Sequence, residues 1–298
     1  MNQERLRDTS SAAISENRPA GADPEKGDPP AAYRDALDLP YYEEDFPGGG
    51  DAAYRAERCR LDVHYPVGAK NAATVLFFHG GGLVKGKKYF PLPLRESGLI
   101  VVSADYRLSS ERARCPDYLH DAAAAAAWTF RHIAFYGGNP DLVFVCGCSG
   151  GAYLAAMIGM DSRYLGRHGV ENRRFAGIMP VSGMMTTHVT VLNERIGATG
   201  LKHPGRAVID EYAPLYHAAA DLPPITLFAG DSRIEWPTRA EENALLASTL
   251  TRVAGHPDVT LHLLSGFDHG DISAPSFLLM RKRINRDRLH FLETRPES

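Results

Sequence analysis

The strongest constraint on the fold is a series of short, continuous apolar runs that alternate with helix-length segments. The runs are 74–79 (TVLFFH), 99–104 (LIVVSA), 142–146 (LVFVC), 175–181, 225–229 (ITLFA) and 259–264 (VTLHLL). Runs of this kind are typical of strands buried on both faces of a parallel sheet. Segments with the length of helices lie between or after them, at 117–135, 150–160, 238–254 and 276–292. The alternation predicts an α/β fold with a mainly parallel central sheet and helices on both faces.

Composition excludes several classes of protein. Hydrophobic residues make up 44% and charged residues 23% of the 298 residues, which is ordinary for a globular protein. The net charge of −3 gives no overall attraction to nucleic acid or to an anionic membrane, and four cysteines do not imply a disulfide framework. The N-terminus lacks the apolar core of a signal peptide, and no segment approaches the roughly 20 apolar residues of a membrane span. We therefore predict a cytoplasmic protein with neither a nucleic-acid nor a membrane partner.

The N-terminal segment differs in composition from the rest of the chain. Residues 1–40 are rich in proline and polar side chains and poor in large aliphatic ones. Such a segment buries too little apolar surface to offset its conformational entropy. We expect residues 1–45 to form a flexible arm and residues 46–298 to form the α/β domain.

The most specific motif is Gly147-Cys148-Ser149-Gly150-Gly151. It follows the apolar run 142–146 and precedes the helical segment 150–160, which is the strand–turn–helix context that G-x-S-x-G requires. Small flanking residues relieve the crowding at a sharp turn whose serine hydroxyl must project from the sheet. The helix that follows directs its positive end toward the serine and favours developing negative charge. The motif predicts that Ser149 is a nucleophile.

A second motif, His79-Gly80-Gly81-Gly82, ends the first apolar run. Consecutive glycines let main-chain N–H groups approach a substrate oxygen closely, so the amides of Gly81, Gly82 and Gly150 are predicted to form an oxyanion hole. We expect His79 to hold this loop through hydrogen bonds rather than to transfer protons. The stretch 81–87 also fits the phosphate-binding pattern G-x-x-x-x-G-K, but a lysine follows where magnesium would need serine or threonine.

A serine nucleophile needs a histidine base and a carboxylate that orients it. In this architecture both follow the serine, with the acid first. Asp231 directly follows one predicted strand, and His269 lies just beyond the last one. We predict that His269 is the base and Asp231 the acid. Glu235 on the same loop is the alternative acid, and Asp268 ranks third because it adjoins the histidine.

Taken together, these motifs resemble the α/β-hydrolase fold over about residues 50–295. The HGGG loop is similar to that of hormone-sensitive-lipase-like carboxylesterases, and the segments GDSRIEWPTRAEEN and GFDHG look like the kynurenine-formamidase and feruloyl-esterase-like group. The resemblance implies Ser149 as nucleophile, Asp231 as acid and His269 as base. The chain departs from these relatives in its GCSGG turn and in Leu83, where an aromatic residue is common.

The resemblance implies a serine carboxylesterase that cleaves small-molecule esters through an acyl-enzyme and needs no metal or organic cofactor. Loop position suggests an apolar substrate pocket near Leu83, Met184, Met185 and Trp236. Two alternatives stay open: an arylformamidase that uses the same triad, and a small-molecule receptor on a hydrolase fold that does no catalysis. The natural ester is not determined, and a homodimer is also left open.

Overall fold

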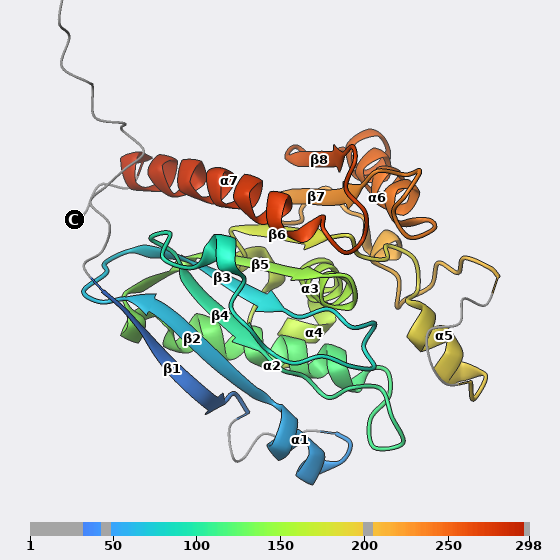
Figure 1. Ribbon diagram of the computed structural model, residues 1–298, viewed down its shortest axis with the longest axis horizontal. Helices are drawn as coiled ribbons and strands as arrows, with labels where there is room; N and C mark the ends of the chain where they lie inside the picture. Colours follow the sequence, from blue (N-terminus) through green and yellow to red (C-terminus); the bar gives the residue numbers. More distant parts are fainter. Residues whose placement is uncertain (1–31, 43–48, 199–204, 295–298) are drawn as a thin grey trace, which may run out of the picture.

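The structure, a computed structural model, describes residues 32–42, 49–198 and 205–294 (Figure 1). Its strands are β1 (Tyr33–Pro40), β2 (Arg60–Pro66), β3 (Ala72–Phe78), β4 (Ile100–Ala104), β5 (Gly138–Cys148), β6 (Gly177–Val181), β7 (Ile225–Gly230) and β8 (Val259–Leu264). Its α-helices are α1 (Ala52–Arg58), α2 (Asp117–His132), α3 (Gly150–Met160), α4 (Ser162–Gly166), α5 (Val189–Arg195), α6 (Arg239–Ser248) and α7 (Ser273–Thr294). A π-helical turn, Thr249–Ala254, continues α6.

The strands of the described chain form one sheet in the order β1-β2-β4-β3-β5-β6-β7-β8. From β4 to β8 every pairing is parallel, whereas β1 and β2 run antiparallel to their neighbours. The six predicted apolar runs become β3 to β8, and the four predicted helices become α2, α3, α6 and α7. The predicted α/β class with a mainly parallel sheet is therefore confirmed.

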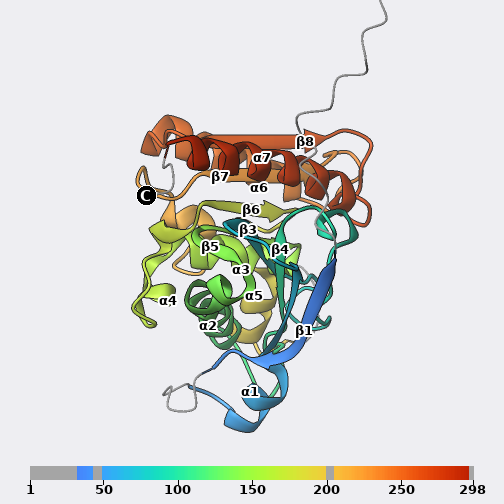
Figure 2. The ribbon, with the colours of Figure 1, turned by 90° about the vertical axis from the view of Figure 1, so that its left-hand side faces the viewer.

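Helices cover both faces of the sheet because successive strand side chains point to opposite sides. In β3, Leu76 and Phe78 pack in the core on the side of α2 and α3, whereas Val75 and Phe77 pack in the core on the side of α7. Figures 1 and 2 show α7 on one side of the sheet and α2 and α3 on the other. No helix in the described ranges is long and apolar enough to cross a membrane.

The predicted flexible arm is wrong for part of its length. Residues 33–40 form β1, an edge strand that pairs antiparallel with β2. Tyr41 follows it, is 3% exposed and donates a hydrogen bond to the carbonyl of Asp105 at 2.7 Å. Main-chain pairing and this buried tyrosine hold the segment despite its few aliphatic residues. The rest of the predicted arm, residues 1–31 and 43–45, lies outside the described residues.

The parallel strands bring their carboxyl ends to one edge of the sheet. Ligands bind at this edge in open α/β sheets, because the loops that follow the strands meet there. His79 follows β3, Ser149 follows β5, Ser182 follows β6 and Asp231 follows β7. The loop that contains His269 follows β8.

Candidate active site

Ser149 occupies a sharp turn between β5 and α3. Its backbone has φ 52° and ψ −116°, a left-handed conformation that costs a non-glycine residue of order 1–3 kcal/mol. The amide of Ser149 donates to the carbonyl of Val181 on β6 at 2.9 Å, which holds the turn against the sheet. A Cβ atom on Gly147 would lie 2.4 Å from the carbonyl of Gly151, and one on Gly151 would lie 2.1 Å from the carbonyl oxygen of Phe78. The turn therefore needs glycine at both positions.

His269 lies against the serine. Its Nε2 is 2.9 Å from the Oγ of Ser149, although 120 residues separate the two in the chain. The indole of Trp236 stacks on the imidazole with ring centroids 3.9 Å apart and planes 8° apart, and this tryptophan is 48% exposed. The structure thus brings together the two side chains that the motifs predicted to meet.

Glu235 holds the other side of the imidazole. Its Oε1 lies 2.7 Å from the Nδ1 of His269 and also accepts the amide of Trp236 at 2.9 Å. Its Oε2 accepts the amide of Gly230 at 3.1 Å. Burial opposes ionisation, yet the hydrogen bonds from His269, from the Trp236 amide and from Ser182 lower the pKa of Glu235 below its ordinary value. The carboxylate is therefore ionised and oriented toward the imidazole at neutral pH.

The expected placement of Asp231 against the histidine is wrong. Its carboxylate accepts hydrogen bonds from Arg233 Nη2 at 2.6 Å, from Arg233 Nε at 2.9 Å and from the amide of Gly266 at 3.0 Å. The bonds from the Arg233 side chain contribute most to lowering the pKa of Asp231. The chain turns after β7, with the amide of Glu235 donating to the carbonyl of Asp231 at 2.8 Å. This turn carries the alternative acid, Glu235, back over the sheet to the imidazole.

Asp268 does not approach the imidazole through a hydrogen bond either. Its Oδ1 accepts the amides of Gly270 at 2.7 Å and of Asp271 at 3.2 Å, which closes the turn after β8. The third-ranked acid therefore shapes the loop that presents His269.

Ser182 is a member of the site that the motif analysis missed. Its Oγ donates to Oε2 of Glu235 at 2.9 Å and lies 2.9 Å from Nδ1 of His269. The residue directly follows β6 and has a φ of 51°, the same left-handed strain that Ser149 shows. The one available signal was its place at a strand end, because no sequence pattern marks a serine in this role.

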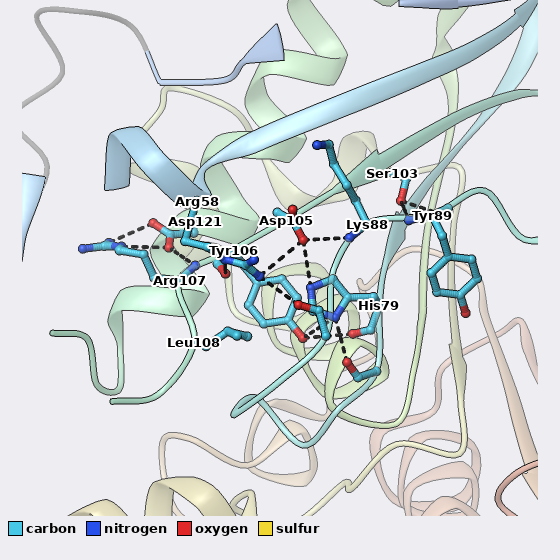
Figure 3. Close-up of polar contacts among 12 residues, drawn as sticks. Arg58, His79, Lys88, Tyr89, Ser103, Asp105, Tyr106, Arg107, Leu108 and Asp121 are labelled. Atoms are coloured by element: carbon cyan, nitrogen blue, oxygen red, sulfur yellow. Dashed lines mark hydrogen bonds and ion pairs between the residues drawn. The ribbon is translucent and has the colours of Figure 1, made fainter. Parts of the chain in front are cut away.

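The HGGG loop is held by a buried network around His79 (Figure 3). The Nδ1 of His79 lies 2.7 Å from the carbonyl oxygen of Gly80, and its Nε2 lies 3.2 Å from Oδ1 of Asp105. The ring of Tyr106 stacks on the imidazole at 4.4 Å, and its hydroxyl donates to the carbonyl of His79 at 2.9 Å. These contacts agree with the positioning role predicted for His79.

Backbone amides of this loop lie beside the serine turn. A Cβ atom on Gly150 would be 3.1 Å from the amide nitrogen of Gly82 and 2.9 Å from that of Leu83. The hydroxyl of Thr190 donates to the carbonyl of Gly82 at 2.6 Å, which fixes the plane of the next peptide. Gly81 lies on the same loop with a φ of 112°, where a Cβ atom would meet the carbonyl oxygen of Lys85 at 2.0 Å. The main chain at Gly82 and Leu83 therefore packs directly against that of Gly150.

The predicted apolar pocket is only partly consistent with the structure. Leu83 and Met185 are 0% exposed and belong to the hydrophobic core, so neither faces open space. Met184 is 3% exposed and its sulfur accepts the amide of Val189. Trp236 alone of the four presents a large surface beside His269. Two other cavities, of about 770 and 520 Å³, have none of Ser149, Glu235 and His269 in their walls.

In the part of the chain that the structure describes, no group of three or more histidine, cysteine, aspartate or glutamate residues is arranged to hold a metal ion. The polar atoms of the site instead pair with one another: serine with imidazole, and imidazole with carboxylate.

Solved esterase structures share this topology. A truncated carbohydrate esterase from gut microbiota superimposes with a TM-score of 0.68 at 17% identity, covering 86% of this chain and 96% of that one. The fold is that of an α/β-hydrolase. The chain belongs to the BD-FAE family, whose model matches residues 61–239.

Curated relatives carry esterase names. A probable carboxylic ester hydrolase of Mycobacterium tuberculosis, LipM, is 29% identical over 211 residues, which cover 62% of this chain and 48% of LipM. A probable isoprenylcysteine alpha-carbonyl methylesterase of Arabidopsis thaliana, ICMEL1, is 26% identical over 240 residues, which cover 72% of this chain and 49% of ICMEL1. The chain thus spans about half the length of these two relatives.

Proposed function

We propose that the chain hydrolyses small carboxylic esters through an acyl-enzyme formed on Ser149. The observation that carries this proposal is the pair of contacts made by His269, 2.9 Å to the serine hydroxyl and 2.7 Å to the Glu235 carboxylate. A hydroxyl, an imidazole and a carboxylate in series are the groups that nucleophilic acyl transfer requires. The esterase names of its relatives support the same class of reaction.

In the proposed mechanism, Ser149 Oγ attacks the ester carbonyl while His269 Nε2 accepts its proton. The ionised Glu235 stabilises the imidazolium and keeps its Nδ1–H in place. The carbonyl oxygen becomes an oxyanion, which accepts hydrogen bonds from the amides of Gly82 and Gly150 and from Gly81 on the same loop. Each such donor is worth about 3 kcal/mol in the transition state.

Collapse of the tetrahedral intermediate expels the alcohol, which takes the proton from His269. Water then attacks the acyl-enzyme, with His269 acting again as base, and the acid is released with Ser149 restored. Every proton moves between the hydroxyl, the imidazole and the reacting oxygens, so the site needs no additional group to complete the cycle.

Turnover of a short aryl ester tests the proposal. We expect Ser149→Ala to lower kcat for p-nitrophenyl butyrate by about 10⁴-fold or more, because the nucleophile is lost. Ser232→Ala is the matched control, since Ser232 is an exposed serine on the acid loop. A fluorophosphonate probe should label the wild type and the control but not Ser149→Ala.

The outcomes separate the remaining alternatives. A receptor that does no catalysis would neither turn over the ester nor react with the probe, and either failure in the wild type would overturn the proposal. An arylformamidase would be labelled by the probe but would hydrolyse N-formylkynurenine faster than short esters. Parallel rates on these two substrates therefore decide between ester and formamide.

A further inference from the structure

Arg239, the first residue of α6, is a buried cation without an ion pair. It is 6% exposed, and its Nε is buried with no hydrogen-bond partner. Among the described residues, no carboxylate lies within salt-bridge distance of its guanidinium. Burying a charge without a partner is costly, and burial lowers the pKa of Arg239 below its ordinary value. A buried and unpaired cation of this kind needs an anionic partner to offset that cost.

The first turn of α6 lies next to the proposed triad. The amide of Arg239 donates to the carbonyl of Trp236 at 3.2 Å, and Trp236 stacks on His269. Asn243 Nδ2 donates to the carbonyls of Arg239 at 2.8 Å and of Gly183 at 3.0 Å. This asparagine therefore ties the start of α6 to the loop that begins with Ser182.

The charge of Arg239 also affects the ionisation of two nearby residues, Glu235 and His188. It favours ionisation of Glu235, and together with burial it lowers the pKa of His188 to about 3. The ring of His188 lies 5.1 Å from the ring of Tyr153 on α3, the helix that starts at the nucleophile. Arg239 is therefore coupled electrostatically both to the triad acid and to a histidine beside α3, the helix that begins at the nucleophile.

The carboxylates nearest to Arg239 are already occupied. Glu242 accepts the amides of Met185 at 2.7 Å and of Thr186 at 2.9 Å, and it also accepts the hydroxyl of Thr238 at 2.6 Å. The Glu235 carboxylate is held by His269, by Ser182 and by two amides. Both acids act on Arg239 from a distance, and neither saturates its five N–H donors.

A second buried polar atom on α6 also lacks a partner. Asn243 Oδ1 makes no hydrogen bond within the described ranges, and the residue is 0% exposed. Positions 239 and 243 are four apart, so they lie on the same face of the helix. Buried polar atoms are nearly always satisfied, so Arg239 Nε and Asn243 Oδ1 are two unmet hydrogen-bonding groups on this face of α6.

We propose that Arg239 binds a carboxylate of the substrate, so that the preferred esters carry a negative charge near the scissile bond. A planar guanidinium matches a carboxylate in a bidentate arrangement, and such a pair is strongest where water is largely excluded. The N-terminal end of α6 adds positive potential at the same place. This inference rests on the proposed esterase function and narrows its substrate class.

Matched ester pairs test the inference. One pair carries the charge in the acyl part: p-nitrophenyl hydrogen glutarate against p-nitrophenyl methyl glutarate. The other carries it in the alcohol part: 4-acetoxybenzoate against its methyl ester. We expect the wild type to favour the anionic member of one pair by about tenfold or more in kcat/KM, mainly through a lower KM. The pair that shows the preference identifies the side of the ester that carries the carboxylate.

Variants assign the preference to one residue. We expect Arg239→Gln to remove the anionic preference, measured as the ratio of kcat/KM for the anionic and the neutral ester of a pair, and Arg239→Lys to keep part of it. Arg233→Gln is the control, because Arg233 is a cation on the adjoining loop whose side chain is 81% exposed. It should leave the preference unchanged.

The results separate this inference from the proposed function. Wild-type turnover of neutral esters with no anionic preference in either pair would overturn the inference alone, whereas no turnover of any ester would overturn the proposed function. If Arg239→Gln lowered kcat/KM equally for charged and neutral esters, the inference would be wrong. Arg239 would then act only by stabilising the two nearby glutamates. If that variant does not fold, inhibition of the wild type still decides. Glutarate should compete with a neutral ester more strongly than glutaramide, and equal inhibition would contradict the inference.

Discussion

At the residue scale, the choice of carboxylate beside the imidazole follows from one loop. Asp231 stands directly at the end of β7, but Arg233 and the Gly266 amide occupy both of its oxygens. Glu235 comes one helical turn later and reaches the imidazole from there. Ser182 supports this arrangement by donating to Oε2 of Glu235, which also accepts the Gly230 amide, while Oε1 accepts the amide of Trp236.

Replacing each acid by its amide tests which one acts. We expect Glu235→Gln to lower kcat by about 10³- to 10⁴-fold, because an amide cannot stabilise the imidazolium or hold its tautomer. Asp231→Asn should keep kcat within about tenfold while lowering thermal stability, since it weakens the bonds to Arg233 and Gly266. Steady-state kinetics and thermal denaturation measure the two effects. The reverse order of activity loss would return the role to Asp231.

At the element scale, the nucleophile depends on how closely α3 approaches the end of β3. The carbonyl oxygens of Phe78 and His79 lie 2.1 and 2.5 Å from where a Cβ atom on Gly151 would stand. Both are main-chain atoms, so they cannot rotate away as a side chain would. The absence of a side chain at position 151 lets the first turn of α3 pack against the end of β3 and brings the Ser149 turn next to the HGGG loop.

A pair of glycine substitutions tests this close approach. We expect Gly151→Ala to lower the free energy of unfolding by about 3 kcal/mol, because it forces the backbone of β3 or α3 to shift. Gly166→Ala at the end of α4 is the control, since a Cβ atom there meets nothing within 4 Å. It should change stability by less than about 1 kcal/mol. Urea unfolding monitored by circular dichroism measures both, and equal effects would contradict the packing argument.

At the scale of the whole molecule, buried polar groups bind the loops to the sheet. Arg107 after β4 forms a buried pair with Asp121 on α2 at 2.8 Å, and Tyr42 donates to the same carboxylate at 2.7 Å. His188, 2% exposed, accepts the amide of Thr190 at 3.1 Å and caps the start of α5.

His188 makes folding stability depend on pH. Its pKa is lowered to about 3 in the folded protein, chiefly by burial, from an ordinary value of 6.5. Between these values the unfolded chain binds a proton that the folded protein does not. The free energy of unfolding should therefore fall as pH drops from about 6.5 toward 3, by at most about 1.4 kcal/mol per pH unit from this group.

Substitution isolates this contribution from that of other groups. Asparagine at position 188 keeps a side-chain acceptor for the cap but does not titrate. We expect His188→Asn to show a shallower loss of stability than the wild type between pH 6.5 and 4, measured by urea unfolding at each pH. Parallel curves for the two proteins would contradict the assignment.

The strands that could be predicted from the sequence are mainly those buried on both faces of the sheet. β3 to β7 are buried along most of their length on both faces and therefore read as continuous apolar runs. β1 has only half-buried and exposed positions, β2 mixes buried with half-buried ones, and β1 also carries Arg34 and Asp35. Charged residues on the open side of an edge strand dilute the apolar signal, so β1 was expected to be part of a flexible arm.

The sequence by itself predicted where Ser149, the HGGG loop and His269 lie in the fold. Each of them belongs to a glycine-rich segment at the end of a predicted strand. Only the tertiary structure decided that Glu235 and not Asp231 meets the imidazole, that Ser182 joins them, and that Arg239 is left without a partner. These outcomes depend on which neighbours from distant segments satisfy each polar atom. Spacing along a chain carries no information about that competition, since it is resolved only when the loops pack together above the sheet.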